Sequence, residues 1–277
     1  MKHKHNKNRI KQRKFKDLSE DDKFKLSLLY KQVKIIIIYM ISDFILAAGV
    51  IQRIKISCNK DAVGINPFLI TRQGQIFSLI ASVLIYDIDL QRYNELVKKE
   101  DELDFSINPE FMISKAAYIT IIDKILDLVG TTNLYEASLI IDIFECSKEE
   151  LESLLIQEFA FVLRFLGDYF IMKATLKNID LIQLQYEDDR DKPSNPKVDS
   201  VIGGGLIFLH RGILLDVNNT EVDALFNESS DLEKELLLNP KVTIGLANRL
   251  GIISNAIVYK AFVEIYNRPE TDPIIGR

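Results

Sequence analysis

Four asparagine–proline pairs divide the chain at regular intervals. Asparagine is a favoured N-cap, and proline suits the first helical position, where its missing N–H is not needed. Each pair therefore predicts the start of a helix. A spacing of about 43 residues relates all four, if a further unit begins near residue 152 without the pair. The pairs are Asn66-Pro67, Asn108-Pro109, Asn195-Pro196 and Asn239-Pro240.

Apolar residues recur at matching offsets after each start. Counted from the asparagine, offsets 3, 11, 14 and 18 are apolar and offset 8 is small. These apolar offsets share one face of a helix, so each unit predicts a long amphipathic helix whose apolar face packs against neighbouring units. An earlier unit that starts at Ser27 has apolar residues at the same offsets, but its offset 8 is Ile35, which is not small. The small position predicts close helix contacts at Gly74, Ala116, Ala160, Gly203 and Ala247.

The second half of each unit is more polar and predicts a second, shorter helix. Residues 132–146 follow a stop at Gly130, and residues 220–238 form the other clear example. Ser147 and Glu150 form a capping-box pattern that opens the next long helix. The fold class is therefore all-α, with about six helical hairpins in an α-solenoid-like array or a closed bundle. The period resembles that of HEAT and armadillo arrays, but their internal signatures are absent and no family is assigned.

The domain organisation follows from this repeat and from one polar stretch. We expect a basic flexible arm over residues 1–18 and helical repeats one to four over 19–186. The acidic, proline-containing stretch 187–200 predicts a linker, and repeats five and six occupy 201–277.

Residues 1–16 carry eight basic side chains and no acidic one, although the whole chain has a net charge of −5. Such an arm can serve as a weak electrostatic anchor on an anionic membrane or a nucleic acid, or it can be a solvated tail. The basic residues are Lys2, Lys4, Lys7, Arg9, Lys11, Arg13, Lys14 and Lys16.

The strongest candidate for a membrane span is Ile35–Gln52. It contains Asp43, and a charge in the middle of a bilayer is costly. The other apolar runs contain charges too, so the sequence favours buried helices of a cytoplasmic protein and leaves open whether this run inserts. The internal charges of those runs are Arg72, Asp123, Arg164, Asp168, Arg211 and Arg249.

No motif fixes a chemistry. Gly203-Gly204-Gly205 lacks the spacing of a phosphate-binding loop, and His210 has no metal-like partner in the sequence. The pairs Asp87/Asp89 and Asp123/Asp127 are interpreted as solvated charge, and Cys58 and Cys146 as isolated thiols of a reducing compartment. We therefore predict no catalytic, cofactor-binding or metal-binding residue.

These observations predict a non-enzymatic helical scaffold that binds another protein or copies of itself, in the second case as a homo-oligomer. The alternative is a peripheral membrane or nucleic-acid-associated protein anchored by residues 1–16. No small-molecule substrate is identified. An enzyme would need a polar pocket around His210 and Arg211.

Overall fold

The computed structural model describes residues 18–59, 64–144, 147–184, 193–268 and 273–276. The described residues form long helices and contain no strand, which confirms the all-α prediction. One 3-10 turn, η1 (Glu100–Glu102), accompanies the long helices. These are α2 (Glu20–Cys58), α3 (Pro67–Val97), α4 (Asn108–Ala137), α5 (Lys148–Leu184), α6 (Pro196–Glu228) and α7 (Asp231–Tyr266).

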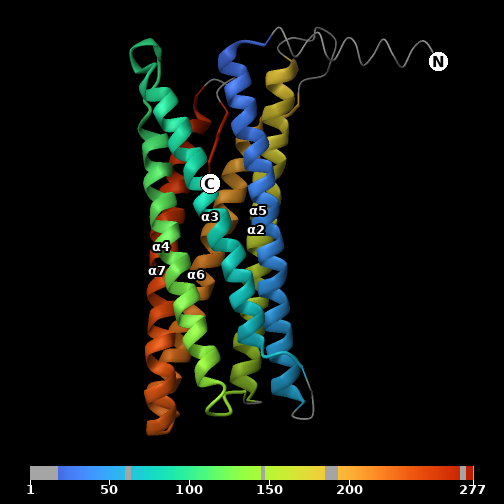
Figure 1. The fold of residues 1–277 in the computed structure, drawn as a ribbon, viewed down its shortest axis with the longest axis vertical. Helices are drawn as coiled ribbons and strands as arrows, with labels where there is room; N and C mark the ends of the chain where they lie inside the picture. Colours follow the sequence, from blue (N-terminus) through green and yellow to red (C-terminus); the bar gives the residue numbers. More distant parts are fainter. Residues whose placement is uncertain (1–17, 60–63, 145–146, 185–192, 269–272, 277) are drawn as a thin grey trace, which may run out of the picture.

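The helices close into a ring. Helix α2 packs on α3 and α5, α4 packs on α3 and α7, and α6 packs on α5 and α7. Consecutive helices run in opposite directions (Figure 1), so α2, α4 and α6 begin at one end and α3, α5 and α7 at the other. We call these the upper end and the lower end. Because each half of the chain has three helices, the second half starts in the direction opposite to the first.

Each stretch in which a hairpin was predicted contains one long helix, so the predicted hairpins are wrong. Helix α4 continues through Gly130 to Ala137, and α6 continues through Thr220 to Glu228. The separate second helices over 132–146 and 220–238 are therefore absent. Gly130 lies within α4 and does not end it. The glycine instead allows a close approach of α7. A Cβ there would be 3.0 Å from the carbonyl oxygen of Pro240.

The asparagine–proline pairs mark helix starts in three of the four cases. Asn66 and Asn195 are N-caps whose side chains accept hydrogen bonds from Phe68 N and Lys197 N, at 3.0 and 2.9 Å. Asn108 begins α4 without a side-chain cap. The predicted start at Asn239-Pro240 is wrong, because a complete capping box between Ser230 and Glu233 starts α7 earlier and leaves the proline inside the helix.

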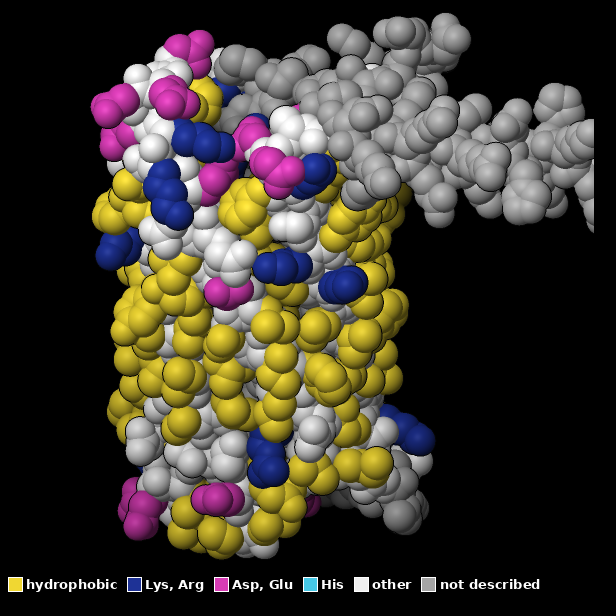
Figure 2. Space-filling view, turned by 45° about the horizontal axis from the view of Figure 1, so that its top comes forward, with side chains coloured by type: hydrophobic (Ala, Val, Ile, Leu, Met, Phe, Trp, Pro, Cys, Tyr) yellow, Lys and Arg dark blue, Asp and Glu magenta, His cyan; other side chains and the backbone are white. Residues whose placement is uncertain are grey.

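At mid-height the outer surface of the bundle is apolar, as Figure 2 shows for one face. The charged side chains at that height are mostly buried. Every exposed residue of this apolar belt is aliphatic, aromatic or glycine, apart from Arg249. Phe44, for example, is 65% exposed, whereas Asp43 beside it is 2% exposed. The apolar belt comprises residues 35–54, 74–86, 116–135, 159–172, 200–215 and 242–259 of the six helices in turn.

The predicted apolar faces therefore point outward rather than toward neighbouring units. In α3, Phe77, Ile80 and Leu84 occupy three of the repeat offsets, and all three are exposed. Among the described residues, four helices are long and apolar enough to cross a membrane by length and composition: α2, α3, α6 and α7.

The upper end is tied together by several contacts. Arg268, just after α7, donates to both carboxylate oxygens of Glu110 in α4, at 2.6 and 2.9 Å. The segment 273–276 enters the bundle there, with Ile274 and Ile275 each 2% exposed (Figure 1). Gly276 exchanges two 3.3 Å hydrogen bonds with the side chain of Gln32 in α2. The C-terminal segment thus fills the core at the upper end.

A second tie at the upper end joins α2 to α3. Lys99, beyond the end of α3, pairs with Asp21 and Glu95. Burial alone would lower the pKa of Lys99, but its hydrogen bonds to these two carboxylates raise that pKa above its ordinary value. The ammonium group therefore stays charged at physiological pH, and the tie persists.

Candidate functional site

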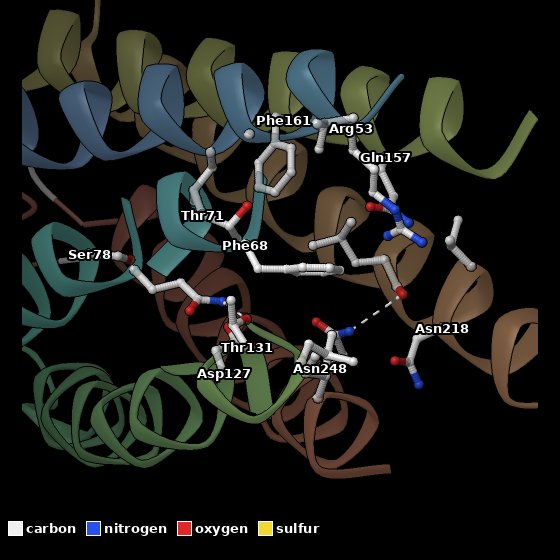
Figure 3. Close-up of a pocket in the computed structure, with 18 of the residues that line it drawn as sticks. Arg53, Phe68, Thr71, Ser78, Asp127, Thr131, Gln157, Phe161, Asn218 and Asn248 are labelled. Carbon is white, nitrogen blue, oxygen red and sulfur yellow. Dashed lines mark hydrogen bonds between the residues drawn. The ribbon is translucent and has the colours of Figure 1, made fainter. Parts of the chain in front are cut away.

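A cavity of about 130 Å³ lies in the core between mid-height and the lower end. All six helices contribute to its wall, and Figure 3 shows Phe68, Phe161 and Asn248 reaching it from three of them. Its mid-height end is polar and contains four cationic or imidazole side chains, which we call the charged layer. The charged layer consists of Lys124, Arg164, His210 and Arg211.

Arg211 joins three helices on one side of the charged layer. From α6 it donates to both oxygens of Asp123 in α4, at 2.5 and 2.7 Å, and to Asn248 Oδ1 in α7, at 2.8 Å. A longer contact of 3.2 Å reaches Asp127. A Cβ at Gly251 would lie 2.6 Å from Arg211 Nε, so the glycine gives this buried guanidinium its space.

Arg164 joins three other helices on the opposite side. From α5, its Nε lies 2.8 Å from Asp43 Oδ1 in α2, and its Nη2 donates to Ser78 Oγ in α3 at 3.0 Å. Its guanidinium also stands 5.8 Å from the ring of Tyr39. A buried ion pair is expensive to desolvate and is tolerated where further hydrogen bonds complete it. Both arginines meet that condition.

Lys124 and His210 complete the charged layer between the arginines. The ammonium of Lys124 lies 3.4 Å from Asp123 and 3.6 Å from Asp127, which is too far for strong hydrogen bonds. His210 Nδ1 is 2.8 Å from the carbonyl oxygen of Ala160. A carbonyl only accepts, so Nδ1 carries the hydrogen, and in the neutral imidazole Nε2 then presents a lone pair. Within the described part of the chain, Nε2 is buried without a partner.

Gln75 contributes a second unsatisfied acceptor to the same cavity. Its amide nitrogen donates to Thr131 Oγ1 at 2.7 Å. Its amide oxygen is buried and has no hydrogen-bond partner among the described residues. The cavity wall therefore offers the loosely paired ammonium of Lys124, and the two closely paired arginines, beside two free acceptors. A bound molecule could interact with both kinds of group.

A wider vestibule of about 580 Å³ lies below the cavity at the lower end. The two spaces share Arg53, Phe68, Leu134, Glu221 and Lys241 in their walls, so these residues stand where they meet. Lys241 pairs with Glu221 at 3.2 Å, and Arg53 pairs with Glu150 of the vestibule. On the other side of the charged layer, toward the upper end, lies a smaller cavity of about 30 Å³. The vestibule thus continues the main cavity toward the lower end.

The residues predicted as helix contacts are placed as follows. A Cβ on Gly74 would lie 2.8 Å from Leu46 Cγ of α2, and one on Gly203 would lie 2.7 Å from the carbonyl oxygen of Gly167 in α5. Ala116, Ala160 and Ala247 are completely buried. The predicted anchor residues of the basic arm, Lys2, Lys4, Lys7, Arg9, Lys11, Arg13, Lys14 and Lys16, lie outside the described residues.

The interpretation of the carboxylate pairs as solvated charge is wrong for three of the four aspartates. Asp89, Asp123 and Asp127 are at most 8% exposed, and only Asp87 faces outward. The sequence analysis also missed the site itself, although Asp123, Arg164 and Arg211 already stood out as charges within apolar runs. The sequence could not show that these charges meet one another.

The described residues include no cluster of three or more His, Cys, Asp or Glu side chains that could hold a metal ion. The predicted linker 187–200 falls partly outside the described residues, and its last five residues belong to α6. Comparisons of the chain with protein-family models, with curated proteins and with solved structures found no match.

Proposed function

We propose that this chain is an integral membrane protein that binds a polar solute in the cavity and carries it across the bilayer. One observation supports this above all: the exposed surface at mid-height is apolar, while the charges at that height face the core. A soluble bundle would have the opposite arrangement. In a membrane, intramembrane charges face the bundle interior and mark solute pathways.

The height of the apolar belt differs between helices. It covers 20 residues of α2 and of α4, which span roughly the 30 Å of a hydrocarbon core, and 13 to 18 residues of the other four helices, which span roughly 20–27 Å. The exposed Gln73 and Asp87 of α3 would then lie near the two membrane interfaces. Arg249 is the exception, and its exposure to lipid would cost about 3 kcal/mol at the bilayer centre. A contact between copies of the chain at α7 would remove this cost, which keeps the predicted self-association as a proposal.

The topology also supports a carrier. We infer that the 43-residue spacing is a repeat of single helices, three of which make one half of the protein. Helices α2–α4 and α5–α7 then form two halves of opposite orientation. Gly74 packs on Leu46 in the first half as Gly203 packs on Ile171 in the second. Inverted repeats with a site near the bilayer midplane are a common plan of secondary transporters.

The charge of the connecting segments suggests an orientation. Eight of the basic residues precede α2, which begins at the upper end, and Lys98 and Lys99 follow α3 at that end. Loops rich in lysine and arginine stay on the cytoplasmic side. We therefore propose that the upper end is cytoplasmic and that the vestibule opens to the opposite side. The scaffold and nucleic-acid roles predicted from the sequence remain alternatives to this proposal.

Cysteine labelling tests the membrane placement. Phe44→Cys, made in a Cys58→Ser/Cys146→Ser background, places a thiol in the apolar belt. We expect it to resist a membrane-impermeant maleimide in isolated membranes, because lipid shields it. The matched control is Cys146→Ser alone, which keeps the exposed Cys58 at the lower end. Equal labelling of the two thiols, with the protein in the soluble fraction, would overturn the proposal.

A further inference from the structure

We propose that the cavity binds a small zwitterion, namely an α-amino acid with an apolar side chain. This inference rests on the proposed function, because it names the solute of the same site. It follows from three properties of the cavity wall and one of the vestibule: cationic donors, free acceptors, an apolar lower part and an acidic entrance.

The donors fit a carboxylate. Lys124, Arg164 and Arg211 all line the cavity, whereas two of their partner carboxylates, Asp43 and Asp123, lie behind the wall. The wall at the charged layer therefore presents more positive than negative charge to a ligand. Lys124 contributes most, because its ammonium has three donors and its two ion pairs are long.

The acceptors fit an ammonium group. His210 Nε2 and Gln75 Oε1 are buried in the described structure without a hydrogen-bond donor. Leaving a buried acceptor unsatisfied costs about 1–3 kcal/mol. A ligand ammonium has three N–H donors and can supply both atoms. A simple carboxylate has no donor at all, so it would leave both acceptors unsatisfied.

The lower part of the cavity fits an apolar side chain. Below the charged layer the wall becomes mostly aliphatic and aromatic, and the volume of about 130 Å³ limits the ligand to a small molecule. A second charged group on the ligand would find charged partners only at the junction with the vestibule, where Arg53, Glu221 and Lys241 lie. The apolar wall residues include Leu46, Val50, Phe68, Phe161, Leu214 and Val217.

The vestibule disfavours free anions. Five acidic side chains line it against two basic ones, so its field repels a negatively charged solute and admits a neutral zwitterion. A plain amine would pass the vestibule but would meet the cations of the charged layer. The acidic residues are Asp142, Glu149, Glu150, Glu221 and Glu233, and the basic ones are Arg53 and Lys241.

Calorimetric titration of the purified full chain in lipid nanodiscs tests this inference with three probes. L-leucine carries both charged groups, 4-methylpentanoate lacks the amine, and 3-methylbutylamine lacks the carboxylate. We expect leucine to bind and each truncated probe to bind at least tenfold more weakly, because a site built to hydrogen-bond a group rejects the analogue without it.

Matched variants locate the binding. Gln75→Leu removes a free acceptor of the cavity, and we expect it to weaken leucine binding at least tenfold. Gln73→Leu makes the same change on the exposed face of the same helix and should leave binding unchanged. Lys124→Met removes a cationic donor for the carboxylate of the ligand, and we expect it to weaken leucine binding too. Lys115→Met makes the same change on the exposed face of α4 and is its matched control. Equal effects within each pair would contradict binding in this cavity.

The outcomes separate this inference from the proposed function. Binding of 4-methylpentanoate as tight as that of leucine would overturn the zwitterion in favour of an anion, and equal binding of the amine would overturn it in favour of a cation. If no probe binds while Phe44→Cys is shielded in membranes, the amino-acid class is wrong and the membrane placement stands. If Phe44→Cys labels freely in soluble protein, the proposed function itself fails.

Discussion

Gly203→Ala tests the close contact between α5 and α6 on which the ring depends. The added Cβ would lie 2.7 Å from the carbonyl oxygen of Gly167 and 2.7 Å from Cγ1 of Ile171. It would also lie 3.2 Å from the backbone nitrogen of Ile171. Two of these three neighbours are backbone atoms, which cannot rotate away as a flexible side chain can. The two helices must therefore separate locally to accept the methyl group.

The expected cost follows from two opposing effects. Overpacking a close contact costs about 1–3 kcal/mol, and the rigid neighbours place Gly203→Ala in the upper part of that range. Alanine has a higher helix propensity than glycine, which offsets up to about 1 kcal/mol. We therefore expect a net destabilisation of about 1–2 kcal/mol.

Gly212→Ala is the matched control on the same helix. Gly212 is exposed, and a Cβ there would meet nothing within 4 Å. Only the gain in helix propensity remains, so this variant should be unchanged or up to about 1 kcal/mol more stable. Equilibrium unfolding of both variants in detergent micelles measures the difference. If the two substitutions change stability equally, the α5–α6 contact is not as close as described.

Two further variants probe the core, and thermal unfolding in micelles measures both. Arg211→Met should destabilise the protein by about 3 kcal/mol, because it leaves the buried Asp123 and Asp127 with only the more distant ammonium of Lys124, whereas Arg249→Met on the exposed face of α7 should not destabilise it. A tolerated Arg211→Met would argue against the buried network. Replacing Ile274 and Ile275 with alanine should cost at least about 3 kcal/mol, because both side chains are buried in the upper end. The exposed Ile253→Ala is the control, and equal stability of the two variants would show that the C-terminal segment is not packed there.

Local features of the fold were predictable because local chemistry determines them. The N-caps Asn66 and Asn195 satisfy backbone donors of their own first turn, so the residue type and its neighbours suffice to predict them. The start at Asn239 was not predictable in this way. A stronger capping box at Ser230 lies upstream, and a proline within a helix is unusual unless packing compensates for it.

The apolar periodicity predicted the faces of the helices but gave the wrong direction for them. Phe77, Ile80 and Leu84 repeat correctly along α3, yet they cover the outside of the bundle. Periodicity reports that one side of a helix differs from the other. Which side faces the core depends on the solvent, and an apolar face turns outward when the surroundings are lipid. The periodicity alone does not reveal whether the helices are surrounded by water or by lipid.

The internal charges were evidence against membrane spans only as long as each was considered alone. Asp43 pairs with Arg164, and Asp123 pairs with Arg211, across helices that are distant in the sequence. Considered as pairs inside the bundle, these charges do not argue against membrane spans.

Buried charges also explain why α4 and α5 are not among the four helices that are apolar enough, by composition, to cross a membrane. These two helices carry half of the buried charged side chains of the described structure. A mean hydropathy taken over all residues of a helix counts these interior charges together with its exposed face. On their exposed faces within the apolar belt, α4 and α5 present only aliphatic and aromatic side chains, as the other helices do apart from Arg249 and Gly212. Counting exposed residues alone therefore groups all six helices together, and that is the physical basis of our proposal that the whole ring lies in a bilayer.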